Sequence, residues 1–163
     1  VQYNGPQTAL TSLQFKKYKG KDINILEIGV HKGGSLQMWQ AYFGKNAKIF
    51  GMDIDPQCKS YENENTKVFI GDQSDRKFLR EVVSKMPKLD IVIDDGGHTS
   101  KMQINSFEEL YPNISENGVY IVEDTHTNFW PKYQKGVRKS FIEYSKKLID
   151  ELHNHLIRLF LPA

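Results

Sequence analysis

The chain has 163 residues, enough for one domain with a substantial core and too few for two. Its 22 Lys and Arg residues and 20 Asp and Glu residues give a formal net charge of +2, and 39% of the residues are hydrophobic. This composition excludes intrinsic disorder and a fibrous protein, and the near-neutral charge lacks the basic footprint of a nucleic-acid-binding protein.

The single cysteine and the N-terminus predict where the protein resides. Cys58 has no partner for an internal disulfide, which favours a reducing compartment. No window approaches the ~20 apolar residues that cross a bilayer, and the N-terminal residues lack the basic-then-apolar pattern of a signal peptide. We expect a soluble cytoplasmic protein that does not insert into membranes. Because the chain begins with Val1 rather than Met, we also expect that its N-terminus is trimmed.

Five apolar, β-branched runs alternate with amphipathic stretches, which is typical of a parallel sheet covered by helices. The predicted strands are residues 23–30, 47–53, 66–71, 89–95 and 118–124. We predict an α/β fold in one domain spanning residues 1–163: a doubly wound, mostly parallel sheet with flanking helices and an N-terminal lead-in at 1–20. Many sheets of this kind have six or seven strands, so we expect the C-terminal strands to be missing.

Four helices are predicted between and after these strands. The first covers residues 35–43 and has Ser35 as its N-cap. The second covers 74–86 and ends before Pro87, and the third covers 99–111 and ends before Pro112. The fourth covers 137–160. In the second helix one face is apolar and consists of Phe78, Leu79, Val82, Val83 and Met86. In the last helix the apolar residues at helical spacing are Phe141, Tyr144, Leu148, Leu152 and Leu156.

Acidic residues and glycines close most of the predicted strands. In an open parallel sheet, ligands bind beyond the carboxyl ends of the strands, so function should reside in these residues. They are Glu27, Gly29, Asp53, Gly71, Asp72, Asp94, Asp95, Gly96, Gly97, His98, Glu123 and Asp124. So many carboxylates on one rim repel one another unless cations or hydrogen-bond donors neutralise them. The alternative, for any single Asp, is a helix cap or a turn.

The turn LEIGVHKGGS places glycines between a strand and a helix, where a nucleotide can approach the backbone. The second glycine of a dinucleotide-binding fingerprint is replaced by His31, which disfavours NAD, and no Walker-type motif occurs. Asp53 closes the second strand, where a carboxylate binds a ribose diol. These features fit an adenosine moiety. His31 and Lys32 are expected to face solvent.

The motifs DDGGH and VED follow the fourth and fifth strands. If these strands are neighbours, about 4.8 Å apart, Asp95 and the pair Glu123 and Asp124 end close together. Three carboxylates suit Mg²⁺ or a similar hard cation better than zinc. His98 follows as a general base, or alternatively as a helix-start residue that binds backbone. Asp94 is expected to point away from Asp95, because side chains alternate along a strand.

Residues 125–136 follow the fifth strand and combine three aromatic residues with a proline. We interpret this segment as a lid over a substrate. The alternative is an ordinary loop in which Phe129 and Trp130 fill the core. Trp39 and Phe43, four residues apart on the first helix, are expected in the core.

Taken in order, the motifs LEIGVHKGGSLQMW, FGMDIDP, GDQSD, DIVIDDGGH and GVYIVEDTHTNFWPKY resemble those of the S-adenosylmethionine-dependent sugar O-methyltransferases of the macrocin and mycinamicin type. This is a metal-dependent branch of the class I methyltransferases, and the resemblance covers about residues 23–149. It implies a Rossmann-like fold and Mg²⁺ ligands at Asp95, Glu123 and Asp124, with His98 as the catalytic base. The cofactor-binding residues it implies, with Asp72 and Gln73 near the adenine, are Glu27, Gly29, Gly33, Ser35, Asp53, Asp72, Gln73 and Asp94.

The implied activity is methyl transfer from S-adenosylmethionine to a sugar hydroxyl of a glycosylated natural product or surface saccharide. Its partner is therefore a small-molecule or saccharide acceptor, and the family predicts a homo-oligomer. The alternatives are a methyltransferase acting on a catechol-like phenol, a hydroxylase-associated protein of the same fold, and a non-catalytic adenosine-ligand-binding module. A nicotinamide dehydrogenase is a further alternative, but hydride transfer needs no carboxylate metal site.

Overall fold

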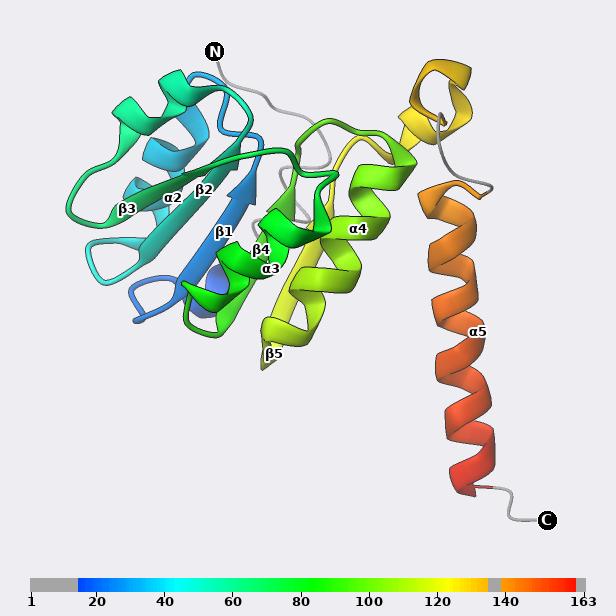
Figure 1. Cartoon of the computed structure of the whole chain (residues 1–163). Helices are drawn as coiled ribbons and strands as arrows, with labels where there is room; N and C mark the ends of the chain where they lie inside the picture. Colours follow the sequence, from blue (N-terminus) through cyan, green and yellow to red (C-terminus); the bar gives the residue numbers. More distant parts are fainter. Residues whose placement is uncertain (1–14, 135–138, 161–163) are drawn as a thin grey trace.

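The computed structural model describes residues 15–134 and 139–160, and there a five-stranded parallel sheet carries helices on both faces (Figure 1). The strands are β1 (Asn24–Ile28), β2 (Lys48–Asp53), β3 (Thr66–Ile70), β4 (Leu89–Asp94) and β5 (Ile114–Val122). The α-helices are α2 (Gly34–Phe43), α3 (Arg76–Ser84), α4 (Ser100–Leu110) and α5 (Phe141–Phe160). Short 3-10 helices are η1 (Lys16–Tyr18), η2 (Pro56–Tyr61), η3 (Tyr111–Asn113), η4 (Thr125–Phe129) and η5 (Pro131–Tyr133). The predicted α/β fold is confirmed.

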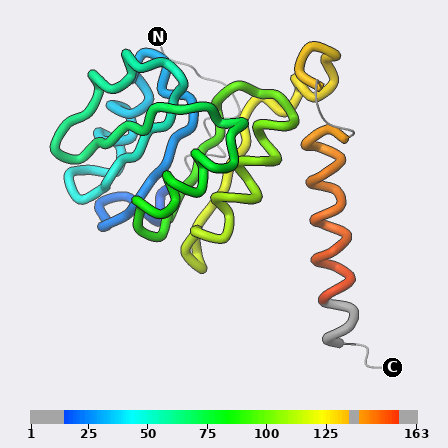
Figure 2. Tube along the Cα trace, viewed as in Figure 1, coloured from blue at the N-terminus to red at the C-terminus, as the bar shows by residue number. Residues whose placement is uncertain are grey.

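The strand order is β3-β2-β1-β4-β5, and every neighbouring pair is parallel. The chain builds outward from β1 to β3 and then crosses back to place β4 on the other side of β1, a path that Figure 2 traces. The direction of winding therefore reverses between β1 and β4, which is the point where open α/β sheets bind ligands. The predicted adjacency of the fourth and fifth strands is confirmed.

Each face of the sheet has its own apolar core, because successive side chains of a strand point to opposite faces. One face packs Phe15 and Tyr18 near η1, and Leu36 and Phe43 of α2, against strand residues that include Ile25, Ile49, Val68 and Ile91. The other packs Leu79, Val82, Met86 and Leu110, from α3 and α4 and their ends, against Leu26, Phe50 and Val92. The expected burial of Phe43 is confirmed, and Trp39 packs partly buried against the first core.

The ends of several elements differ from the prediction. Ser35 is not an N-cap: α2 begins one residue earlier, and Gly33 caps it with a left-handed backbone and no side-chain bond. The Ser35 hydroxyl instead donates to Glu27 of β1. The helix expected from residue 74 begins at Arg76, because the Asp75 carboxylate accepts from the Lys77 amide as the N-cap. Strand β5 begins at Ile114 rather than at residue 118, with a register irregularity opposite the start of β4.

Helix α5 lies beside α4 and runs past the beginning of β5 (Figure 1). Phe141 and Tyr144 at its start contact Phe107 of α4, as the apolar spacing predicted. Farther along the predicted apolar face, Leu148 is half-buried and Leu152 is exposed, and the side chain of Leu156 lies outside the described residues. The predicted start of this helix, residue 137, lies outside the described residues. None of the described helices is long and apolar enough to cross a membrane.

Gly29 lets the first loop approach the end of β4. Its φ is +94°, and a Cβ at this position would lie 2.2 Å from the backbone oxygen of Asp95. Hydrogen bonds fix the approach on both sides: the Gly29 amide donates to Met52 O at 2.8 Å, and the Asp95 amide donates to Ile28 O at 3.0 Å. Only glycine fits here, and this close packing brings the loop after β1 against the loop after β4.

We predict that Gly29→Ala lowers the free energy of unfolding more than Gly20→Ala does. Gly20 also has a positive φ, +74°, but nothing lies within 4 Å of its missing Cβ. The control therefore measures backbone strain alone, about 1–2 kcal/mol. The clash with the Asp95 carbonyl should add at least ~2 kcal/mol to the cost of Gly29→Ala, by analogy with overpacked cores. Urea unfolding of both variants measures the difference, and equal losses would show that the approach tolerates a side chain.

Candidate active site

The carboxyl ends of β1, β2, β3 and β4 surround a cavity of about 910 Å³. The loop after β1 forms one wall, and the loop between β4 and α4 forms another. Eight of the twelve residues predicted to act in catalysis, cofactor binding or metal binding line this cavity: Gly29, Ser35, Asp53, Asp72, Gln73, Asp95, His98 and Asp124. The structure thus brings together residues that are up to 95 positions apart in the chain.

Four other predicted site residues are not among the residues that line the cavity: Glu27, Gly33, Asp94 and Glu123. Glu27 lies buried beneath the first loop, and its carboxylate accepts hydrogen bonds from Ser35 Oγ at 2.7 Å and Trp39 Nε1 at 3.3 Å. Gly33, with φ +70°, is pressed against the Tyr61 ring, where a Cβ would lie 2.6 Å from the nearest ring carbon. Both residues shape the loop from behind. His31 and Lys32 are exposed at the rim, as predicted.

Asp53 holds the first loop as well as facing the cavity. Its Oδ2 accepts the backbone amides of Val30 at 2.8 Å and His31 at 2.9 Å, and its Oδ1 accepts the amide of Asp55 at 2.9 Å. Burial acts to raise the pKa of Asp53, but these amide donors outweigh it and the pKa lies below its ordinary value. Asp53 is therefore ionised and fixed in place, a role that the sequence pattern did not reveal.

Asp94 and Gln73 form a buried support under the loop that follows β4. Gln73 Nε2 donates to Asp94 Oδ1 at 2.6 Å, and Gln73 Oε1 accepts the Gly97 amide at 3.0 Å. Burial raises the pKa of Asp94 from 3.8 to about 7. Asp94 is buried whereas Asp95 is exposed, which agrees with the alternation expected along a strand. Gln73 thus anchors this loop and also lines the cavity.

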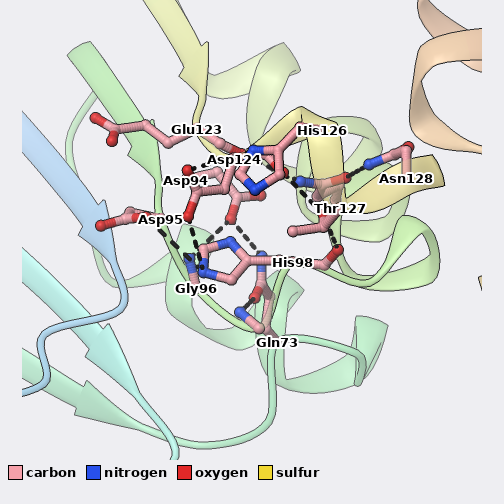
Figure 3. A network of polar contacts seen from close by, with 12 residues as sticks. Gln73, Asp94, Asp95, Gly96, His98, Glu123, Asp124, His126, Thr127 and Asn128 are labelled. Atoms are coloured by element: carbon pink, nitrogen blue, oxygen red, sulfur yellow. Dashed lines mark hydrogen bonds and ion pairs between the residues drawn. The ribbon is translucent and has the colours of Figure 1, made fainter. Parts of the chain in front are cut away.

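Asp95, His98 and Asp124 form a compact group at the end of the cavity near β5 (Figure 3). Their candidate ligand atoms all lie within 4.8 Å of one another. His98 Nε2 is 4.0 Å from Asp95 Oδ1 and 3.8 Å from Asp124 Oδ2. His98 and Asp124 have left-handed backbones, with φ of +55° and +50°. Such angles are rare outside glycine and occur often at functional sites.

Glu123, predicted as the third carboxylate ligand, is not in this group. Figure 3 shows its carboxylate directed away from His98 and Asp124. Even so, partial burial and the charges of Asp95 and Asp124 raise the pKa of Glu123. Burial also raises the pKa of Asp95, and repulsion from Asp124 adds to it while His98 opposes it. The carboxylates in this corner therefore crowd one another electrostatically, as the sequence predicted for the rim.

The segment after β5 folds into the short helices η4 and η5 instead of an irregular loop. Phe129 is 72% exposed and Trp130 is 51% exposed, so they do not fill the core. His126 lies edge-on to Trp130 at 5.1 Å between ring centroids, and its Nδ1 is 3.8 Å from Asp124 Oδ1. Aromatic surface therefore begins directly beside the acidic group. The predicted end of this segment, residue 136, lies outside the described residues.

A buried polar seam between α4 and η4 was missed from the sequence. Asn128 Nδ2 donates to Gln103 Oε1 at 2.9 Å, and Ser100 Oγ donates to Asn128 Oδ1 at 3.2 Å. Thr127 Oγ1 reaches the backbone oxygens of His98 and Asp124. The sequence did contain one sign of this seam. Ser100, Gln103 and Ser106 recur at helical spacing on the buried face of α4, where apolar residues are usual.

We predict that Glu27→Gln makes the stability of the chain less dependent on pH. Burial raises the pKa of Glu27 from 4.5 to about 7, although the Ser35 and Trp39 hydrogen bonds act against it. The folded state then binds this proton more tightly than the unfolded chain, so the contribution of Glu27 to stability falls as pH rises from about 4.5 to about 7. Glutamine keeps the shape and does not ionise.

Between about pH 5 and about pH 8, Glu27→Gln should gain up to about 3 kcal/mol relative to the parent chain. Urea unfolding at each pH measures the gain. Glu64→Gln, which changes an exposed carboxylate, is the control and should show no such gain. A difference between Glu27→Gln and the parent that does not vary with pH would contradict the protonation of buried Glu27.

Residues 26–125, more than half of the chain, match a protein family described as a methyltransferase domain. The chain is 32% identical over 157 residues to the 8-demethyl-8-alpha-L-rhamnosyl tetracenomycin-C 2'-O-methyltransferase of Streptomyces olivaceus, covering 90% of this chain and 41% of that protein. It is 37% identical over 127 residues to the mycinamicin VI 2''-O-methyltransferase of Micromonospora griseorubida, covering 73% of this chain and 31% of that protein. The chain thus spans less than half the length of these relatives.

Among solved structures, the MycE methyltransferase from the mycinamycin biosynthetic pathway, in complex with Mg and S-adenosylhomocysteine, matches with a TM-score of 0.85 and 29% identity. The match covers 97% of this chain and 46% of that one. A short-chain dehydrogenase of Burkholderia cenocepacia in complex with NADP shares only the fold, with a TM-score of 0.54 and 12% identity. Sheet topology alone therefore does not distinguish a protein that binds S-adenosylhomocysteine from one that binds NADP. The family match is more specific, because residues 26–125 include the first loop, Asp53 and the group from Asp95 to Asp124. The chain belongs to the methyltransferase domain family.

Proposed function

We propose that this chain is the catalytic domain of an S-adenosylmethionine-dependent and Mg²⁺-dependent O-methyltransferase whose acceptor is a sugar hydroxyl on a glycosylated small molecule. The observation that carries the proposal is the position of Asp95, His98 and Asp124. They combine two carboxylates and an imidazole at one end of a cavity whose other end carries the glycine loop and Asp53. This arrangement supports a proton acceptor and cation ligands beside a nucleotide-sized site.

The donor set fits a hard divalent cation. Carboxylate oxygens with open positions for water suit Mg²⁺. The pKa of Asp95 and of Glu123 is raised first by burial and then by the neighbouring carboxylates, and a bound cation would offset both effects, which supports this fit. His98 Nδ1 is buried without a hydrogen-bond partner among the described residues, and Nε2 faces the two carboxylates of Asp95 and Asp124 at 4.0 and 3.8 Å. We propose Asp95 and Asp124 as ligands and retain Glu123 as a predicted third.

The other end of the cavity fits the methyl donor. Asp53 is ionised and faces the cavity where a ribose would bind, and Asp72 and Gln73 line the part assigned to the adenine. Gly29 keeps the first loop close to the cavity floor. Four further residues complete the proposed cofactor site. Ser35 lines the edge of the cavity, and the walls are supported from behind by Glu27, Gly33 and Asp94. The MycE structure, which holds S-adenosylhomocysteine, supports this assignment by its similarity.

The proposed acceptor follows from the aromatic surface and from the relatives. Trp130 contacts both His126 and Tyr133, and His126 lies next to Asp124, so these three rings form an aromatic group beside the acidic residues. Aromatic faces bind flat, partly apolar molecules and leave polar edges free. Two of the relatives are named as O-methyltransferases that act at a sugar position of a glycosylated compound. We therefore assign residues 125–134 to the acceptor side of the site.

In the proposed reaction, a bound cation would supply a positive charge beside the acceptor hydroxyl and lower its pKa. His98 Nε2 accepts the hydroxyl proton as the oxygen attacks the methyl group of S-adenosylmethionine. The new C–O bond forms while the C–S bond breaks, and S-adenosylhomocysteine leaves. The cavity walls align the oxygen, carbon and sulfur, and this alignment contributes several kcal/mol of the rate enhancement.

The direct experiment incubates the chain with methyl-labelled S-adenosylmethionine and two acceptor panels, glycosylated molecules with vicinal sugar diols and simple catechols, with Mg²⁺ or with a chelator. Labelled sugar product that disappears in chelator is the expected result. Preferential catechol labelling would replace the sugar acceptor by a phenol. Equal labelling in chelator would remove the metal from the proposal, and cofactor binding without any product would favour a non-catalytic binding module.

We predict that His98→Ala lowers kcat/KM by about 10²–10⁴-fold, the usual contribution of a general base. Affinity for S-adenosylhomocysteine, measured by calorimetry, should not change, because His98 lies at the acceptor end of the cavity. His153→Ala on the exposed part of α5 is the matched control and should keep the parent rate. Equal loss of turnover and cofactor affinity in His98→Ala would remove His98 from the role of base.

Other sequence-based predictions accompany this proposal. We retain a cytoplasmic location, a homo-oligomer, the absence of a nucleic-acid partner, and a single domain with residues 125–136 as its acceptor lid. Cys58 is buried and free, which is compatible with a reducing compartment.

A further inference from the structure

Two residues of the acidic group have backbone conformations that their own side chains disfavour. His98, in the loop between β4 and α4, has φ +55°, and Asp124, after β5, has φ +50°. Residues other than glycine keep such angles only where surrounding contacts hold them. The contacts made by these two backbones therefore bear on where the His98 and Asp124 side chains lie.

Thr127 supplies contacts to both residues. Its Oγ1 donates to the backbone oxygens of His98, at 3.0 Å, and of Asp124, at 2.8 Å (Figure 3). One hydroxyl proton is thus shared between two carbonyl acceptors, one in each loop. The Thr127 amide donates to the same Asp124 oxygen at 3.0 Å. With only 3% of its surface exposed, Thr127 makes these bonds out of reach of competing water.

The position of Thr127 is itself fixed by its neighbour. Asn128 is 1% exposed and binds Ser100 and Gln103 of α4 through its side chain. The Ile142 amide at the start of α5 also donates to Asn128 Oδ1, at 3.2 Å. The hydroxyl of Thr127 is therefore presented from a rigid, buried point to which α4 and α5 both contribute.

We propose that Thr127 is a positioning residue whose hydroxyl clasps the loops of His98 and Asp124 together and so sets the geometry of the cation site. Thr127 touches neither the cavity nor the candidate ligand atoms. It acts through the two backbones, which direct His98 Nε2 and Asp124 Oδ2 to within 3.8 Å of each other. The clasp is a property of the chain alone, whereas its effect on cation binding rests on the proposed function.

The first test needs no metal. Backbone ¹³Cα and ¹³Cβ NMR shifts of His98 and Asp124 report their dihedral angles in the parent chain, in Thr127→Val and in Thr127→Ser. Valine keeps the shape and loses the hydroxyl, so both residues should shift toward ordinary conformations; serine keeps the hydroxyl and should retain the parent shifts. Thr66→Val, at a buried threonine of β3 at the opposite end of the sheet, is the control. Unchanged shifts in Thr127→Val would overturn the clasp.

The second test is calorimetric titration of the same variants with Mg²⁺ and, separately, with S-adenosylhomocysteine. Thr127→Val should raise the Kd for Mg²⁺ by about 10-fold or more, as losses of supporting contacts around metal ligands usually do. Its Kd for S-adenosylhomocysteine should stay at the parent value, and Thr127→Ser should restore Mg²⁺ binding. If Thr127 had a merely structural role, Thr127→Val would weaken the binding of Mg²⁺ and of S-adenosylhomocysteine together. That result would overturn the proposal, and so would Mg²⁺ binding by Thr127→Val that equals that of the parent.

The two tests separate this inference from the proposed function. If the parent chain binds no Mg²⁺, the metal dependence of the proposed function is wrong. The ¹³Cα and ¹³Cβ shifts of His98 and Asp124 still decide whether Thr127 holds the two loops. If Thr127→Val does not fold, Thr127→Ala, which removes the methyl group as well as the hydroxyl, takes its place in both measurements.

Discussion

The carboxylates that close β1, β2, β4 and β5 lie at one edge of the sheet, where each negative charge raises the cost of holding the next. The structure meets this constraint differently at each position. The negative charge of Asp53 is stabilised by three backbone amide donors, whereas buried Glu27 and Asp94 have raised pKa values of about 7 and accept side-chain donors. Asp95, Glu123 and Asp124 receive no comparable donors, and this remaining charge is what a cation would offset. The corner near β5 is therefore where we propose that the cation binds.

The restraints on this corner come from two sides of the cavity. On one side, Gly29 allows the first loop to press against the Asp95 backbone, and Gln73 ties Asp94 to the Gly97 amide. On the other side, the polar seam of α4 holds the segment after β5. Buried hydrogen-bond networks of this kind rigidify the loops that they join. A site built in this way is positioned before any ligand arrives, which is the condition for efficient alignment in catalysis.

The sequence predicted the sheet well, because strands buried on both faces consist of continuous β-branched runs that differ from the amphipathic helices between them. It also placed Asp95, His98 and Asp124 together, since parallel neighbouring strands end at the same edge. Other features depend on contacts between distant segments. The hydroxyl of Ser35 bonds to Glu27 of a neighbouring strand instead of capping its own helix. No local pattern reveals the positive φ at Asp124, which helps to set where its side chain and that of Glu123 point.

The central claim is that the cavity holds an S-adenosyl compound beside a cation-binding group. Calorimetric titration of the chain with S-adenosylhomocysteine, with NAD⁺ as comparator and Mg²⁺ present throughout, tests it most directly. We expect micromolar binding of S-adenosylhomocysteine and no measurable binding of NAD⁺. Equal or tighter binding of NAD⁺, or no binding of either compound by the folded chain, would contradict it.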